Sequence, residues 1–222
     1  MAQNPFQAVW FDLDGTLFDT AEDLIPAVNA TLADFDYPLA GANVLRRWIN
    51  FGARGMLSAG IQSERDDPRV DAMLECFSEH YLNQLSQHTR LFPGMDRILN
   101  KLDSKGIPWG IVTNKAERFT IPLIEQLGYS KRITGLVCGD TTDESKPSAK
   151  PLLYACAVAG HDPEHCLYAG DNSTDIIAGK AASMRAVVAC AYGYVPEGEN
   201  PTHWGADYVI DQAAAFESIL WD

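Results

Sequence analysis

The sequence contains few cysteines and no closely spaced pair of them. Its five cysteines lie far apart among 222 residues, with no Cys-x-x-Cys pair and no Cys/His knuckle, and its five histidines show no metal-ligand spacing. Neither a redox dithiol nor a structural zinc site is therefore predicted. Each cysteine stands in an apolar stretch, so we expect all five to be small buried side chains in a reducing compartment. They are Cys76, Cys138, Cys156, Cys166 and Cys190.

The chain also lacks long apolar segments and an excess of basic residues. No stretch reaches about 18 uninterrupted apolar residues, and the N-terminus has no signal-peptide pattern. The 17 Lys and Arg residues stand against 30 Asp and Glu, which gives a net charge of −13. Nucleic acids and anionic membranes attract clustered basic residues, so neither is expected as a partner. We expect a cytoplasmic protein, and the sequence does not indicate its oligomeric state.

Short apolar runs alternate with helical patterns through most of the chain. This alternation predicts right-handed β-α-β units, and hence an α/β fold with a mostly parallel sheet and helices on both faces. The predicted strands are 7–11, 109–112, 136–138, 166–169, 186–190 and 208–210. The predicted helices are 95–102, 119–127, one starting at 151, 175–182 and 213–220.

Residues 17–90 break this rhythm. Helical spacing of apolar residues covers 21–35, 44–59 and 70–85, and no strong strand pattern occurs between them. We therefore predict a small all-helical insert at 17–90, placed after the first strand. Residues 1–16 and 91–222 then form the α/β core.

Polar residues follow the ends of the predicted strands. Asp12 and Asp14 come after the first strand, Thr113-Asn114 after the second, and Gly170-Asp171 after the fourth. The carboxyl ends of parallel strands meet at one edge of a sheet, where such folds bind ligands. Lys146, between the third and fourth strands, can bring an ammonium group to the same edge. We expect these side chains to converge on one crevice.

Four carboxylates would gather in this crevice, from Asp12, Asp14, Asp171 and Asp175. Such a group repels itself unless a hard cation binds, and Mg²⁺ suits it because Mg²⁺ prefers oxygen ligands and leaves room for a substrate phosphate. A hydroxyl and backbone N–H groups at residue 113, with the lysine, suit the oxygens of a phosphoryl group. The set predicts phosphoryl transfer through a nucleophilic Asp.

Four motifs, in this order, resemble the signatures of the haloacid dehalogenase superfamily, specifically its D-x-D-G-T phosphatases. They are Phe11-Asp12-Leu13-Asp14-Gly15-Thr16-Leu17-Phe18-Asp19-Thr20, Thr113-Asn114, Lys146-Pro147 and Gly170-Asp171-x-x-x-Asp175. The resemblance extends over nearly the whole chain. It implies a Rossmann-like catalytic core with the 17–90 segment as a cap.

The resemblance also implies roles for single residues. Asp12 attacks phosphorus and forms an aspartyl-phosphate, and Asp14 protonates the leaving oxygen and then activates water. Thr113 and Asn114 hold the transferring group, and Lys146 neutralises its charge.

Further roles concern the metal. Mg²⁺ is held by the Asp12 side chain, the Asp14 backbone carbonyl and Asp171, while Asp175 supports the metal shell or the lysine. The third signature departs from the family pattern, because Ala149 stands where its middle proline is expected. Lys150 therefore remains a rival to Lys146.

The implied substrate is a small phosphorylated metabolite. The context of the motifs most resembles the phosphoglycolate phosphatase-like group, and residues 106–115, 192–194 and 200–207 also resemble N-acetylmuramic acid 6-phosphate phosphatases of cell-wall recycling. Arg54, in a segment with few bases, is expected either to bind a distal anionic group of the substrate or to be a solvated surface residue. Lys115 and Arg118 are weaker candidates for that anion.

Other interpretations stay open at this point. Thr113 alone could cap the following helix, and Gly170-Asp171 could be an ordinary turn with Asp175 exposed. A sugar-phosphate mutase of the same fold would pass the phosphoryl group back to a sugar. A phospho-accepting receiver module also combines Asp, Thr and Lys, but such modules are about half this length and have no insert. Dehalogenation is disfavoured, because it needs no general acid at Asp14.

Overall fold

The computed structural model describes residues 5–221, and its centre is a sheet of six parallel strands in the order β5-β4-β1-β6-β7-β8. The strands are β1 (Ala8–Phe11), β4 (Trp109–Val112), β5 (Leu136–Val137), β6 (Cys166–Gly170), β7 (Ala186–Cys190) and β8 (Tyr208–Ile210). All six lie where the apolar runs predicted them. β1 is central, and the chain builds outward from it toward both edges, so β1 and its two neighbours form the switch point of the sheet.

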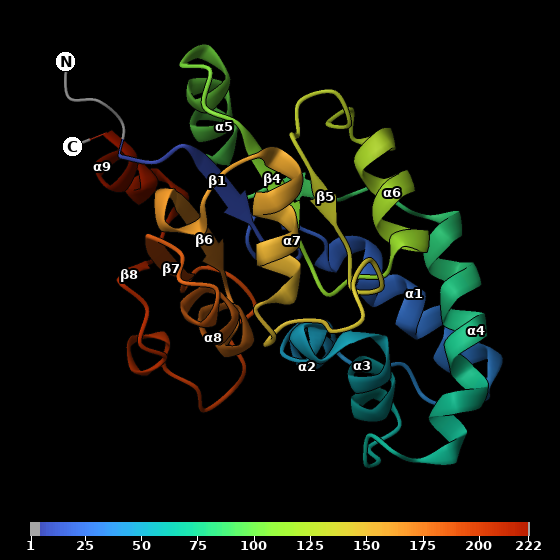
Figure 1. The fold of residues 1–222 in the computed structure, drawn as a ribbon. Helices are drawn as coiled ribbons and strands as arrows, with labels where there is room; N and C mark the ends of the chain where they lie inside the picture. The colour runs from blue at the N-terminus through green and yellow to red at the C-terminus, as the bar shows by residue number, and fades with distance from the viewer. Residues whose placement is uncertain (1–4, 222) are drawn as a thin grey trace.

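Helices cover both faces of this sheet, as predicted, and alternate residues of each strand point to opposite faces. In β1, Val9 and Phe11 face one layer, while Ala8 and Trp10 face the other. The first layer contains α5 (Met95–Ser104), α6 (Glu117–Gln126) and α9 (Phe216–Trp221), and the second contains α7 (Lys150–Ala159) and α8 (Ser173–Ala181). Figure 1 shows α7 and α8 on one side of the strands.

The segment between β1 and α5 is mainly helical. It contains α1 (Ala21–Asp34), α2 (Ala42–Arg46), the short 3-10 helix η1 (Ile49–Phe51), α3 (Gly52–Gly60) and α4 (Pro68–Asn83). α1 packs along α4, and Figure 1 shows the four helices gathered beyond one end of the sheet. The insert therefore lies over the strand ends where the polar residues were expected.

Two details of the insert differ from the sequence prediction. The expected helix 44–59 is divided into α2, η1 and α3. The break between η1 and α3 falls at Gly52, whose φ of +69° interrupts a right-handed helix. A two-residue strand β2 (Phe18–Asp19) also pairs antiparallel with β3 (Arg90–Leu91). Each of these two strands consists of one apolar and one charged residue, so no apolar run marks it. The chain thus enters and leaves the insert side by side.

Two expectations from composition can be compared with the structure. Four cysteines are buried as expected, but the prediction is wrong for Cys76, which is partly exposed on α4. Within residues 5–221, no helix combines the length and apolar character needed to cross a membrane.

Candidate active site

The turn after β1 carries the first two carboxylates. The Asp12 N–H donates to the Ala169 carbonyl at 2.8 Å, which continues the β1–β6 pairing by one residue. Asp12 is only 6% exposed. The turn then depends on Gly15, whose φ is +88° and where an added Cβ would lie 2.1 Å from Asp171 Oδ2. The D-x-D-G sequence therefore allows the two Asp-bearing strand ends to approach closely.

Lys146 is buried at the centre of the site. Its ammonium lies 2.7 Å from Asp12 Oδ1, 2.7 Å from Asp175 Oδ1, 2.9 Å from the Tyr168 hydroxyl and 3.0 Å from the Val112 carbonyl. Burial alone would lower the pKa of Lys146, but Asp12 and Asp175 raise it above its ordinary value. The ammonium is thus held charged between two carboxylates. Its three protons are shared among four acceptors.

Three carboxylates share this buried region. Oxygens of Asp12, Asp171 and Asp175 all lie within 4.8 Å of one another. Burial raises the pKa of Asp12 to about 7, even though Lys146 opposes this shift, and the negative charge of Asp175 adds to it. Burial and the same neighbouring carboxylates raise the pKa of Asp171 well above its ordinary value. One ammonium does not offset three carboxylates, so the donor set fits a divalent cation that prefers oxygen ligands.

Asp175 is positioned by the start of α8. Asn172 and Asp175 form a capping box, in which the Asn172 N–H donates to Asp175 Oδ2 at 3.0 Å. The other oxygen accepts from Lys146 and from Tyr168. Asp175 is 1% exposed, so the interpretation of an ordinary turn with this residue in solvent is wrong. Its contacts link it to Lys146.

Asp171 receives hydrogen bonds from both the core and the insert. The Tyr194 N–H donates to Asp171 Oδ2 at 2.7 Å, and the Asn50 amide donates to the same oxygen at 3.0 Å. Asn50 also donates to the Tyr194 carbonyl at 2.8 Å. Asn50 belongs to η1 of the insert and was not predicted, since nothing in its spacing marks a contact with a residue 121 positions away.

Asp14 lies nearer the mouth of the site, and two groups hold it. Thr20 Oγ1 donates to Asp14 Oδ1 at 2.6 Å, and the Lys115 ammonium lies 3.1 Å from the same oxygen. Lys115 also stands 4.6 Å above the centre of the Tyr81 ring, which belongs to α4. Asp14 is thereby connected to the insert through Lys115. Sequence reasoning considered Lys115 only for a distal anion and missed this ion pair.

Thr113 and Asn114 follow β4 but use their side chains differently. Thr113 is buried, and its Oγ1 accepts from the Lys115 N–H at 3.2 Å. It does not cap α6, whose N-cap residue is Ala116, so that alternative is wrong. Asn114 exchanges two hydrogen bonds of 3.0 Å with the backbone of Lys146. Asn114 therefore fixes the loop that presents the lysine.

These side chains line a cavity of about 210 Å³ between the sheet and the insert. Its polar part includes Asp12, Asp14, Thr113 and Lys146. Its apolar part comes mostly from the insert and includes Leu24, Ile49, Met56, Phe77, Tyr81 and Phe119. A cavity of this size, with a polar end and an apolar wall, suits a small molecule.

The structure does not bring Arg54 to this cavity. Gly52 and Ala53 line it, whereas the Arg54 guanidinium pairs with Asp71 and donates to the Arg65 carbonyl at 3.1 Å. The first two residues of α3, rather than the arginine side chain, therefore line the cavity.

Two other cations considered from the sequence also lie elsewhere. Lys150 is paired at the surface with Asp143, at 2.8 Å, and with Glu144. Arg118 donates to Ser78 Oγ at 2.9 Å and lies 3.7 Å from Glu75. Only Lys146 of the two rival lysines reaches Asp12.

Known proteins resemble this chain over its full length. Residues 9–189 match the family described as haloacid dehalogenase-like hydrolases. An N-acetylmuramic acid 6-phosphate phosphatase of Pseudomonas aeruginosa is 36% identical over 99% of this chain and 97% of its own. A phosphoglycolate phosphatase of Xanthomonas campestris pv. campestris is 37% identical over 97% of each chain. The crystal structure of a predicted phosphoglycolate phosphatase from Haemophilus somnus has a TM-score of 0.86 and 27% identity over 98% of this chain and 99% of its own.

The family match and these relatives agree with the four ordered motifs and with the α/β fold, so the resemblance inferred from the sequence is confirmed. The chain is a phosphatase that belongs to the haloacid dehalogenase-like hydrolase family.

Proposed function

We propose that the protein is a Mg²⁺-dependent phosphomonoesterase that acts through an aspartyl-phosphate on Asp12. The observation that carries this proposal is the buried Asp12 carboxylate at the polar end of the cavity, held 2.7 Å from Lys146 and clustered with Asp171. A nucleophilic carboxylate must be oriented and kept ionised beside an anionic substrate, and the ammonium supports both.

The proposed reaction has two steps. Asp12 attacks phosphorus, and the phosphorus–oxygen bond to the leaving group breaks while Asp14 gives that oxygen a proton. Water then attacks the aspartyl-phosphate, Asp14 takes a proton from it, and inorganic phosphate leaves with Asp12 restored. Lys146 and Thr113 stay near the transferring oxygens throughout. Their inclusion in the cavity wall supports these roles.

We assign the metal to the carboxylates of Asp12 and Asp171 and to the Asp14 backbone carbonyl. When bound, Mg²⁺ supplies positive charge that offsets the charge of the phosphoryl oxygens. Asp175 is assigned to positioning Lys146, which its hydrogen bond of 2.7 Å supports. Asn114 is assigned to positioning the loop that carries Lys146, which its two hydrogen bonds to the Lys146 backbone support.

We propose that residues 17–90 form a cap domain and that residues 1–16 and 91–222 form the catalytic core. Closure of such a cap excludes bulk water and restricts the substrate to metabolite size. Two contacts between the insert and the site support this assignment. Asn50 donates to Asp171, and the Tyr81 ring lies against the Lys115 ammonium. The unpaired cysteines support a cytoplasmic location.

Two substrates within this class deserve direct comparison. Phosphoglycolate is the broader candidate, since several relatives carry that name. The apolar cavity wall favours N-acetylmuramic acid 6-phosphate, whose acetamido and lactyl methyl groups give Leu24, Met56 and Phe77 something to contact. Phosphoglycolate carries no methyl group. Both substrates are carboxylates, and the partial positive charge at the start of α3, beside Gly52 and Ala53, suits one.

The test is phosphate release from phosphoglycolate, N-acetylmuramic acid 6-phosphate, p-nitrophenyl phosphate and a hexose 1-phosphate, with Mg²⁺ or with chelator. We expect Mg²⁺-dependent release that the Asp12→Asn variant loses by at least about 10³-fold. Asp66→Asn, at an exposed carboxylate of the insert, is the matched control and should retain activity. Phosphate release by Asp12→Asn at the wild-type rate would refute the mechanism, and an isomerised hexose phosphate without phosphate release would favour the mutase.

A further inference from the structure

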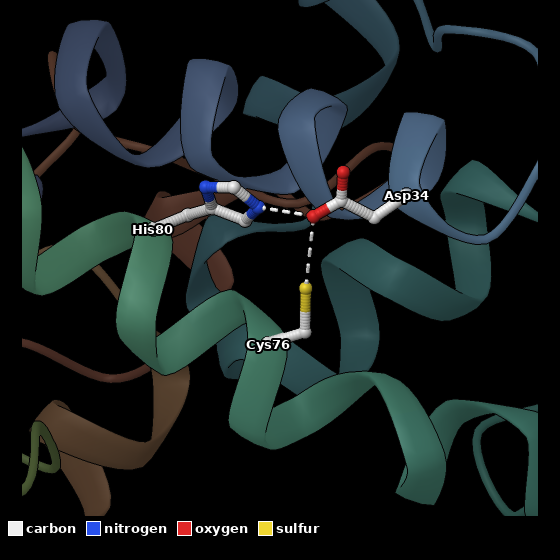
Figure 2. Close-up of side chains that lie close together, drawn as sticks. All are labelled: Asp34, Cys76 and His80. Carbon is white, nitrogen blue, oxygen red and sulfur yellow. Dashed lines mark hydrogen bonds and ion pairs between the residues drawn. The ribbon is translucent and has the colours of Figure 1, made fainter.

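A second group of metal-ligating side chains lies on the insert, away from the cavity. It joins Asp34, the last residue of α1, to Cys76 and His80 on α4 (Figure 2). Asp34 Oδ2 lies 2.6 Å from His80 Nε2 and 3.3 Å from Cys76 Sγ. One ligand atom from each residue falls within 4.8 Å of the others.

The helical spacing brings two of these side chains together. Cys76 and His80 are four residues apart on α4, so they occupy the same face of the helix. Because α1 packs along α4, the carboxylate of Asp34 reaches that face from the neighbouring helix. Figure 2 shows the three polar groups pointing toward one another between the two helices.

The ligand types indicate which cation fits. A thiolate, an imidazole nitrogen and a carboxylate oxygen form a set that suits Zn²⁺ and related transition metals, whereas Mg²⁺ prefers oxygen ligands alone. Around a tetrahedral Zn²⁺, with bonds of about 2.0–2.3 Å, neighbouring ligand atoms stand about 3.3–3.6 Å apart. The separation of 3.3 Å between Cys76 Sγ and Asp34 Oδ2 already meets this requirement. The contact of 2.6 Å between His80 and Asp34 needs to open by less than about 1 Å.

The exposure of the group also suits a site that metal can enter. Cys76 and His80 are partly buried and Asp34 is exposed, so solvent reaches the cluster from one side. The other four cysteines are buried. Three protein ligands leave a fourth position for water.

We propose that Asp34, Cys76 and His80 form a Zn²⁺-binding site that ties α1 to α4 within the insert. The site is separate in residues and in ligand chemistry from the carboxylates assigned to Mg²⁺. By binding only the folded insert, Zn²⁺ would stabilise the pairing of these two helices.

The experiment titrates the full chain with Co²⁺ as a spectroscopic probe and then displaces it with Zn²⁺, in excess Mg²⁺ to occupy the oxygen ligands of the catalytic site. We expect one equivalent of Co²⁺ to give a thiolate-to-cobalt charge-transfer band. Cys76→Ser removes that band, and Cys76→Ser and His80→Ala each weaken Zn²⁺ binding by more than about tenfold, since loss of even an outer-shell partner costs 10–100-fold in affinity. Zn²⁺ should also raise the melting temperature of the wild type and not of Cys76→Ser.

His203→Ala, at an exposed histidine outside the insert, is the matched control and should bind as the wild type does. The proposal fails if wild-type protein gives no thiolate band, or if Zn²⁺ affinity stays within about twofold in both Cys76→Ser and His80→Ala. In either case the cluster is only a hydrogen-bonded contact between His80 and Asp34. None of these readings uses phosphatase activity, so this outcome is independent of the proposed reaction.

Discussion

Lys146 supplies the positive charge that pairs with two buried carboxylates of the site. It is 5% exposed and lies between Asp12 and Asp175, so its removal leaves two buried carboxylates without their shared partner. Breaking a buried ion pair by removing one member is strongly destabilising, because the desolvated charge that remains is uncompensated. The same ammonium is proposed to offset charge on the transferring phosphoryl group.

Replacing Lys146 by Met keeps the length of the side chain and removes its charge. We expect Lys146→Met to lower the free energy of unfolding by about 3–5 kcal/mol in metal-free protein and to reduce kcat by at least about 10²-fold. Urea unfolding and steady-state kinetics measure the two effects.

Lys150→Met is the matched control, because Lys150 is the rival lysine at the start of α7 and is paired at the surface with Asp143 and Glu144. Surface pairs contribute little, so this variant should keep the stability and activity of the wild type. Equal losses in the two variants would contradict the assignment of Lys146.

The motifs predicted the site residues that directly follow a strand or belong to a signature. Asp12, Thr113, Lys146 and Asp171 were all predicted, because each follows a recognisable strand or signature and parallel strand ends converge. Asn50 was not, because its importance comes from a contact with a residue far away in sequence. The segment around Arg54 was singled out from the sequence, but Gly52 and Ala53 rather than the arginine line the cavity.

At the scale of elements, a core residue, Tyr194, forms hydrogen bonds with the segment where the chain enters the insert. The Tyr194 hydroxyl accepts from the N–H groups of Thr20, at 2.7 Å, and Ala21, at 3.0 Å, and donates to Asp19 at 2.7 Å. These bonds satisfy N–H groups at the start of α1, which Thr20 does not cap with its own side chain. The loop after β7 therefore anchors the point where the chain enters the insert.

Asn50 makes the corresponding contact from the insert. Asn50→Ala removes the hydrogen bonds to Asp171 and to the Tyr194 carbonyl. A hydrogen bond to a charged group contributes about 1.5–3 kcal/mol, so we expect kcat/KM to fall about 10- to 100-fold. Steady-state kinetics with p-nitrophenyl phosphate measures the change.

Asn29→Ala is the control for this variant, because Asn29 also exchanges hydrogen bonds through its amide, but only with Ala40 inside the insert. Its kcat/KM should stay within about threefold of the wild type. If Asn29→Ala lost as much activity as Asn50→Ala, the contact with Asp171 would have no special role.

The sequence predicted most helices and strands correctly, but it did not predict the break within the 44–59 helix or the short β2–β3 pair. The longer helices and the six strands of the main sheet carry periodic or continuous apolar residues, and these were found. Each strand of the pair β2–β3 has one apolar and one charged residue, and the break between η1 and α3 depends on the φ of Gly52, so neither leaves such a pattern. The Cys76–His80 spacing was overlooked because its third member, Asp34, lies on a different helix.

At the scale of the whole molecule, the acidic excess has a local counterpart in the site. The chain carries a net charge of −13. In the site, the buried carboxylates of Asp12, Asp171 and Asp175 lie beside the ammonium of Lys146. A cluster of this kind makes the metal-free protein sensitive to pH, because the native state retains protons that the unfolded chain releases.

The sign of this effect follows from Asp12. Its pKa is about 7 in the folded protein, against 3.8 for an ordinary Asp, so the native state binds more protons between these values. Stability from this group is therefore present below about pH 4 and is lost as pH rises toward about 7. We expect metal-free wild type to lose melting temperature relative to Asp12→Asn over this range, as measured by thermal unfolding in chelator. A difference that is constant with pH would contradict the raised pKa.

The most direct measurement concerns the covalent step at Asp12. The Asp14→Asn variant should still be phosphorylated by p-nitrophenyl phosphate, because p-nitrophenol leaves without a general acid, but it lacks the base that activates water for the second step. After acid quench and proteolysis, mass spectrometry should find a phosphoryl group on the peptide that contains Asp12, sensitive to hydroxylamine and absent from the Asp12→Asn/Asp14→Asn double variant. An unmodified Asp12, or an equal amount of label in the double variant, would contradict the assignment of Asp12 as the nucleophile.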